Sequence, residues 1–299
     1  MVDRPWWIDA AWAIRDYLRR VWDNSQEDNV LFLASGIAFN ILLAAIPFIL
    51  LLITGFTYLL PRLLAVDPAA AVHQFVEGFL PGPAGGGARV VYGLVDDVLR
   101  TRGTVTVYSA IVFLWFSTRL FGSLRTALAE VFDIERERNL IRGKLFDLQI
   151  TVVATVLFVA SQVVSTWVLL GTTRGLRVLS ELGLRSEIMG RFELWFGRGL
   201  AFAFIAAMFF ALYKYLPVRR VRSRTAWLAA LFSAVLFEVA KSVFRIVVSS
   251  VDVQSLYTGT IAALAIVVAW VYYAALIFLI GGEVGQVYEL RRTRRLQTD

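Results

Sequence analysis

Three charged residues interrupt a long apolar stretch between Thr225 and Ser250, and their spacing places them along one side of a helix. Glu238, Lys241 and Arg245 follow one another at intervals of three and four residues, the spacing of neighbours on a helical surface. A charged side chain inside a bilayer costs on the order of a few kcal/mol, so it normally faces a bundle interior and finds a partner. Lys241 can reach Glu238 within one turn, whereas Arg245 needs an acceptor from another helix, a lipid phosphate or a ligand.

This charged stripe supports two interpretations. Intramembrane charge is typical of substrate and ion sites, where arginine and lysine would bind phosphate or carboxylate. Alternatively, the glutamate and lysine only lock helices together, and the arginine extends toward the lipid head groups. Polar side chains from other apolar stretches extend the first interpretation to a substrate-binding set for an amphiphile with an anionic head. That candidate set comprises Glu238, Lys241, Arg245, Asn40, Gln162, Tyr257, Arg119 and Glu283.

Two members of the set also fit structural roles. Asn40 suits an interhelical hydrogen bond better than a ligand contact. Glu283 lies near Gly281 and Gly285, whose GxxxG spacing lets two helices approach closely and permits self-association. We expect Glu283 to form a structural salt bridge with an arginine on the same side of the membrane. The candidate partners are Arg119, Arg125 and Arg224.

Enzyme chemistry is poorly supported. The chain has no cysteine and a single histidine, His73, so one subunit cannot assemble a thiolate site, a histidine metal cluster or a triad. Two-metal phosphodiester hydrolysis needs several converging carboxylates or histidines, and only Glu238 lies clearly within an apolar stretch. We therefore predict no catalytic residue, no metal and no cofactor, which leaves a membrane-embedded hydrolase or nuclease as the weakest function class.

Composition indicates the class of protein that must position these residues. Of the 299 residues, 58% are hydrophobic and only 18% are charged, against about 25% charged in a soluble domain. Long apolar runs and a mean hydropathy of +0.67 predict an all-α polytopic membrane protein with six transmembrane helices. The net charge of +7 then serves orientation and contact with anionic lipid, not nucleic-acid binding.

The expected domain order follows from the apolar runs. We expect residues 1–29 to form an amphipathic segment on the cytoplasmic face, 30–284 the transmembrane domain, and 285–299 a basic cytoplasmic tail. The N-terminal helix either lies on the membrane surface or packs on the domain as an ordinary amphipathic helix. Within the domain, 61–103 reads as a helical hairpin outside the membrane, and Pro47 should kink the first span. The spans are expected at about 30–60, 104–121, 149–170, 194–216, 225–250 and 256–282.

Basic residues predict the orientation. The N-terminal segment, the connections 127–148 and 217–224, and the C-terminal tail each hold four Lys or Arg. The longer connections 61–103 and 171–193 also hold four each, but at lower density. The positive-inside rule then places both termini in the cytoplasm and the hairpin outside.

The chain resembles the YihY/virulence factor BrkB family of bacterial inner-membrane proteins from about Val30 to Val284. The resemblance is carried by ASGIAFNILLAAIPFILLL (Ala34 to Leu52), WFSTRLFGSLRTALAEVF (Trp115 to Phe132), Leu216-Pro217 and YTGTIAALAIVVAWVYYAALIFLIGGEV (Tyr257 to Val284), which ends in the family's Gly-x-Glu pattern. It implies six spans with cytoplasmic termini in the bacterial inner membrane. The family it resembles was once labelled a tRNA-processing ribonuclease. Some relatives are linked to serum resistance, and some are proposed to move lipids or lipopolysaccharide precursors.

The sequence therefore favours a transporter or translocase of an anionic amphiphile such as a lipid, with membrane lipids as its partners. The rival hypothesis is a structural or scaffolding envelope protein whose charges form purely interhelical pairs. Substrate, direction, energy source and oligomeric state do not follow from the residues.

Overall fold

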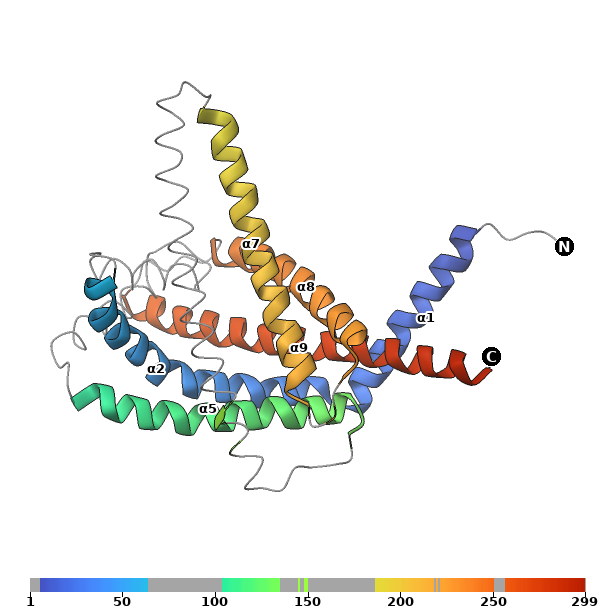
Figure 1. Cartoon of the computed structure of the whole chain (residues 1–299), viewed down its shortest axis with the longest axis horizontal. Helices are drawn as coiled ribbons and strands as arrows, with labels where there is room; N and C mark the ends of the chain where they lie inside the picture. The colour runs from blue at the N-terminus through green and yellow to red at the C-terminus, as the bar shows by residue number, and fades with distance from the viewer. Residues whose placement is uncertain are drawn as a thin grey trace.

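The computed structural model describes residues 6–63, 104–134, 186–217, 221–249 and 256–298, together with positions 145, 148, 149 and 219. Within these ranges the chain is helical, with no strand (Figure 1). The predicted all-α class is therefore confirmed for the described part. Its helices are α1 (Trp6–Glu27), α2 (Val30–Leu63), α5 (Thr104–Val131), α7 (Ser186–Tyr215), α8 (Ser223–Ser249) and α9 (Leu256–Thr298).

Helices α2 and α5 lie side by side along much of their length (Figure 1). The contact face of α2 carries Ala34, Ile37 and Ala38, all at most 4% exposed, at the three- and four-residue spacing of one helical stripe. Farther along, the Phe48 and Phe113 rings stack with centroids 5.3 Å apart. Helix α2 continues through Pro47, and Figure 1 shows its second half curving away from α5. A kink at Pro47 itself stays a prediction.

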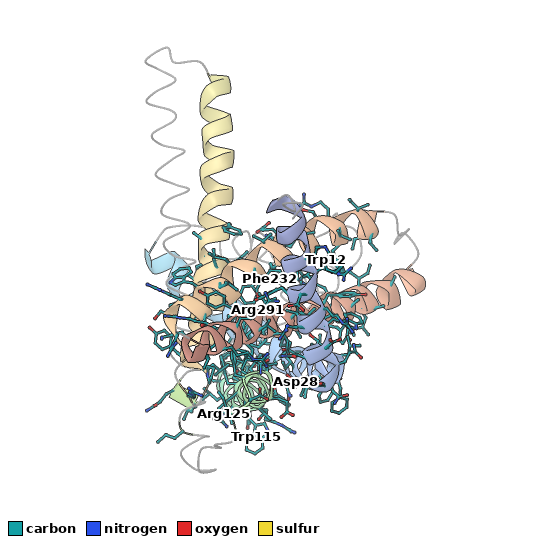
Figure 2. The ribbon with its side chains drawn as sticks, turned by 90° about the vertical axis from the view of Figure 1, so that its right-hand side faces the viewer. Trp12, Asp28, Trp115, Arg125, Phe232 and Arg291 are labelled. Atoms are coloured by element: carbon teal, nitrogen blue, oxygen red, sulfur yellow. The ribbon has the colours of Figure 1, made fainter. Side chains whose placement is uncertain are left out.

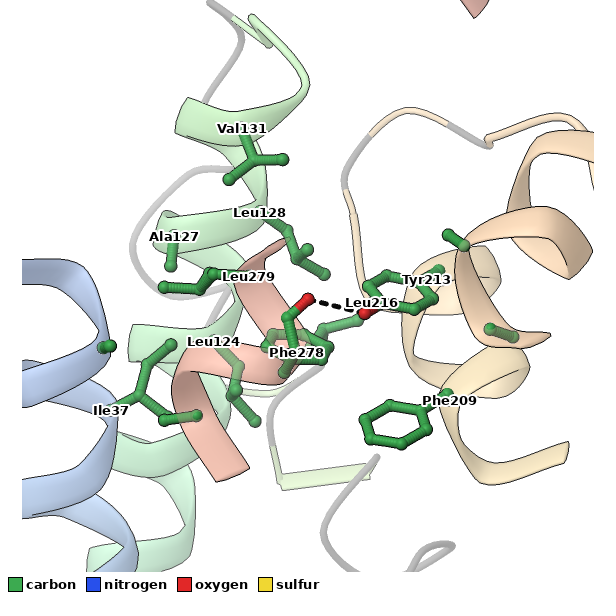
Figure 3. Close-up of a cluster of buried hydrophobic side chains, with 14 of the residues drawn as sticks. Ile37, Leu124, Ala127, Leu128, Val131, Phe209, Tyr213, Leu216, Phe278 and Leu279 are labelled. Atoms are coloured by element: carbon green, nitrogen blue, oxygen red, sulfur yellow. Dashed lines mark hydrogen bonds between the residues drawn. The ribbon is translucent and has the colours of Figure 1, made fainter. Parts of the chain in front are cut away.

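Helix α9 holds the bundle together, because it contacts α1, α2, α5 and α8. Figure 3 shows Leu279 of α9 facing the α2–α5 pair and Phe278 facing α7. The Tyr213 hydroxyl of α7 donates a hydrogen bond to the Phe278 carbonyl at 2.5 Å and lies 2.7 Å from the Ser233 hydroxyl of α8. The buried Tyr213 hydroxyl therefore has hydrogen-bond partners, without which its burial in the core would be unfavourable.

Helix α1 leaves the bundle on the side where α9 ends (Figure 1). A short turn at Asp28 and Asn29 joins α1 to α2, and Asn29 has a positive φ of 50°. Figure 2 shows Asp28 at the bundle end of α1 and Trp12 toward its far end. The basic residues expected to form a separate C-terminal tail instead continue α9, whose helix reaches Thr298.

The helix bounds agree with the expected positions of five of the six spans. Two helical stretches in the described ranges are long and apolar enough to cross a membrane, Val30–Phe48 and Leu264–Arg294, with mean hydropathies of 2.2 and 2.4. Nearly all of the expected hairpin at 61–103 and the third span at 149–170 lie outside the described residues. The number of spans, the hairpin and the domain boundaries stay predictions.

Candidate functional site

The charged stripe of α8 forms the pair that its spacing predicts. Lys241 Nζ lies 2.6 Å from Glu238 Oε1, and the two side chains are 29% and 40% exposed. The same ammonium is 5.7 Å from the centre of the Phe237 ring. Lys241 is thus held by a carboxylate and an aromatic face of its own helix, so this pair needs no second helix to balance its charge.

The stripe lies at one edge of the face that α8 packs against α9. Phe237 and Phe244 of α8 contact the Trp270 ring of α9, with centroids 5.3 and 4.8 Å apart. Each residue advances about 100° around a helix of 3.6 residues per turn, which puts the charged side chains beside this face. Val235 and Val239, farther around the helix, are 54% and 53% exposed. The charged side chains therefore lie between the side of α8 that faces α9 and an exposed apolar side of the same helix.

Arg245 is exposed near the end of α8. Within the described ranges no ion pair involves its guanidinium, whereas Lys241 one turn earlier is paired. Among the described residues, the Arg245 guanidinium therefore has no acidic partner. A guanidinium binds phosphate or carboxylate groups well.

The structure does not bring the other predicted residues to this edge. Asn40 donates from Nδ2 to the Gly36 carbonyl of its own helix at 2.9 Å, rather than to a neighbouring helix. Arg119 is exposed on α5. Gln162 and the side chain of Tyr257 lie outside the described residues. Their substrate-binding roles stay predictions.

Glu283 occupies a different place, in the interior of the helical bundle. Its side chain is 0% exposed, and neither carboxylate oxygen makes a hydrogen bond of normal geometry to a described residue. The predicted salt bridge between Glu283 and an arginine is wrong for the described part of the chain, because neither Glu283 oxygen has a partner there. Arg119 and Arg224 are exposed. The charged groups that act on Glu283 are instead the carboxyls of Asp28 and Asp133.

Three segments that are distant in the sequence meet around Glu283, and we call Asp28, Asp133 and Glu283 the acidic junction. Asp28 belongs to the α1–α2 turn, and Asp133 directly follows α5 with a positive φ of 48°. Gln286 Nε2 donates to Asp133 Oδ2 at 2.6 Å, and its Oε1 accepts from Asn24 Nδ2 of α1 at 3.1 Å. One side chain of α9 therefore ties together α1 and the end of α5.

Burial raises the pKa of Asp28. Carboxylates of Asp133, Glu130 and Glu27 raise it further, while the adjoining Glu283 carboxyl partly opposes the change. Sequence reasoning missed Asp28 and Asp133, since each looks like an ordinary polar residue at a helix end. Their only signal is position, directly outside the long apolar helices that converge on α9.

Gly281 and Gly285 of α9 allow a close approach of two helices, as the GxxxG spacing predicts. The helix that approaches them is α8 of the same chain. A Cβ added at Gly281 would lie 1.8 Å from Ser233 Oγ of α8. One added at Gly285 would lie 3.1 Å from Ala229 Cβ of the same helix. The spacing is thus accounted for by α8–α9 packing, and self-association through it stays a prediction.

Comparisons with known proteins agree with the helical architecture. The family described as Virulence factor BrkB matches residues 21–299. A UPF0761 membrane protein of Acinetobacter baylyi is 26% identical over 89% of this chain and 60% of its own length. Another, from Cronobacter sakazakii, is 24% identical over 95% of this chain and 93% of its own length. No solved structure matches.

The relatives differ in length, so the chain spans about 60% of the Acinetobacter protein but most of the Cronobacter one. Their printed names describe membrane proteins and no enzymatic activity. In the described residues no group of three or more His, Cys, Asp or Glu side chains has the geometry to hold a metal ion. From the family match, which covers nearly all of the sequence, we conclude that the chain is a membrane protein of the virulence factor BrkB family.

Proposed function

We propose that the protein moves an amphiphile with an anionic head, such as an acidic phospholipid, between the leaflets of the bacterial inner membrane. In this proposal both termini face the cytoplasm. Membrane lipids surround the protein and are also its substrate. The substrate head is held by Arg245 and Lys241, and Glu238 acts as counter-charge.

The observation that carries the proposal is the charged edge of α8. Arg245 is exposed and has no ion-pair partner in the described ranges, and farther around the same helix the apolar residues Val239 and Val243 are 53% and 55% exposed. A phosphate in a lipid head group would bind the Arg245 guanidinium. The acyl chain of that lipid would cover exposed apolar side chains of the same helix.

The test is lipid exchange in vesicles containing the purified full-length protein. A fluorescent acidic phospholipid is placed in both leaflets, and a membrane-impermeant reductant bleaches the label that reaches the outside. The double variant Arg245→Ala/Lys241→Ala should lose exchange while keeping its thermal unfolding temperature. Arg224→Ala is the matched control, because this exposed arginine lies in the first turn of the same helix. Exchange at the wild-type rate in the double variant would refute the assignment.

A structural role is the second candidate, and the internal Lys241–Glu238 pair at 2.6 Å favours it. If the charges only stabilise the bundle, the wild-type protein exchanges no lipid and Glu238→Ala lowers the unfolding temperature. A labelled zwitterionic lipid in the same vesicles separates charge recognition from general leakiness.

A further inference from the structure

The acidic junction contains a buried carboxyl whose charge no described group balances. Glu283 is 0% exposed, and both of its oxygens lack a hydrogen-bond partner in the described part. The groups acting on it from the elements packed around it are Asp28 of the α1–α2 turn and Asp133 after α5, both acidic. Glu27 of α1 and Glu130 of α5 add further negative charge near Asp28.

An ionised carboxylate in this position would be very unfavourable. Burying a charge without a partner costs so much that the group takes the neutral form instead, and two adjacent carboxyls cannot both ionise easily. A protonated carboxyl avoids both costs, because it is uncharged and has an O–H that can turn toward Asp28. The described acidic groups do not have the geometry to hold a metal ion, so a proton is the cation that fits.

We propose that Glu283 is a proton-binding site, in which the bound proton lies between the Glu283 and Asp28 carboxyls. The proton adds to a Glu283 oxygen from water by way of Asp28, which is only partly buried, and it leaves by the same path. This inference is independent of lipid movement, since it concerns a different end of the bundle.

Loss of the proton has a structural consequence. It places two negative charges side by side where the α1–α2 turn meets α9, next to the contacts that dock α1. These contacts are the hydrogen bond from the Tyr17 hydroxyl to the Val284 carbonyl and the bond between Asn24 and Gln286 at 3.1 Å. Proton release should therefore loosen α1 from α9, and proton binding should restore the contact.

The test is infrared spectroscopy of the purified full-length protein in detergent, with either glutamate or aspartate carrying ¹³C in the side-chain carboxyl. At neutral pH we expect a protonated-acid carbonyl band that moves with the glutamate label. It should vanish in Glu283→Gln and persist in Glu289→Gln, a control on the same helix. In Asp28→Asn the band should change frequency, because its neighbour has changed.

The wild-type spectrum alone keeps the inference falsifiable if the glutamine variant does not fold. Absence of any protonated glutamate band at neutral pH would overturn the proposal, as would a band that survives in folded Glu283→Gln.

Discussion

Replacing Gly281 with alanine should test the packing of α9 more sharply than any other single change. The added Cβ would lie 1.8 Å from Ser233 Oγ, 2.6 Å from the Tyr213 hydroxyl and 3.1 Å from Ser233 Cβ. Tyr213 cannot move away easily, since it is 0% exposed and its ring stacks on Phe278 with centroids 5.1 Å apart. Something in this contact must therefore shift.

The expected change in the free energy of unfolding has three contributions, two that destabilise the folded protein and one that stabilises it. Overpacking a tight core costs about 1–3 kcal/mol, and losing the Tyr213–Ser233 hydrogen bond costs about 1 kcal/mol more. Alanine recovers about 0.5–1 kcal/mol of helix propensity over glycine. Gly281→Ala should thus reduce the free energy of unfolding by roughly 1–3.5 kcal/mol. A drop of several degrees in unfolding temperature, followed by tryptophan fluorescence in detergent, would report it.

Gly36→Ala is the matched control. It makes the same chemical change within α2, but nothing lies within 4 Å of the added Cβ. It should leave stability unchanged or raise it by up to about 1 kcal/mol. The combination Gly281→Ala/Ser233→Ala should recover part of the loss, because it removes the atom at 1.8 Å. If Gly281→Ala is as stable as Gly36→Ala, the close α8–α9 approach described here is wrong.

Two other changes test how α1 is joined to the bundle. Burial raises the pKa of Tyr17 to about 12, although the nearby Arg291 lowers it in part. The stability that the neutral Tyr17 hydroxyl contributes is therefore fully present below about pH 10, the ordinary pKa of tyrosine. That stability is lost as the pH rises toward 12. Tyr17→Phe should therefore unfold at a lower temperature than wild type at neutral pH, and this difference in unfolding temperature should narrow across the alkaline window. A difference that stays constant with pH would contradict the role of the hydroxyl. At Asn29, whose φ is 50°, alanine should cost about 1 kcal/mol and glycine should be tolerated; equal unfolding temperatures for Asn29→Ala and Asn29→Gly would argue against this turn geometry.

Much of the helical framework could be predicted from the sequence. Apolar runs of 20 or so residues form helices because the backbone must satisfy its own hydrogen bonds, and helices α2, α5 and α8 begin within a few residues of their expected positions. The Glu238–Lys241 pair was also predictable, since two residues three apart on one helix are neighbours whatever the rest of the chain does. The predicted family is confirmed by the match over residues 21–299.

What surrounds Glu283 was decided by the tertiary structure alone. Asp28 and Asp133 come from segments far away in the sequence, and no local rule says that both approach the same turn of α9. The expected side of the membrane therefore suggested an arginine as the partner of Glu283, whereas the packing of the helix ends places two carboxyls near it. Helical periodicity determines which residues share a face, but only the docking of one helix on another determines what that face meets.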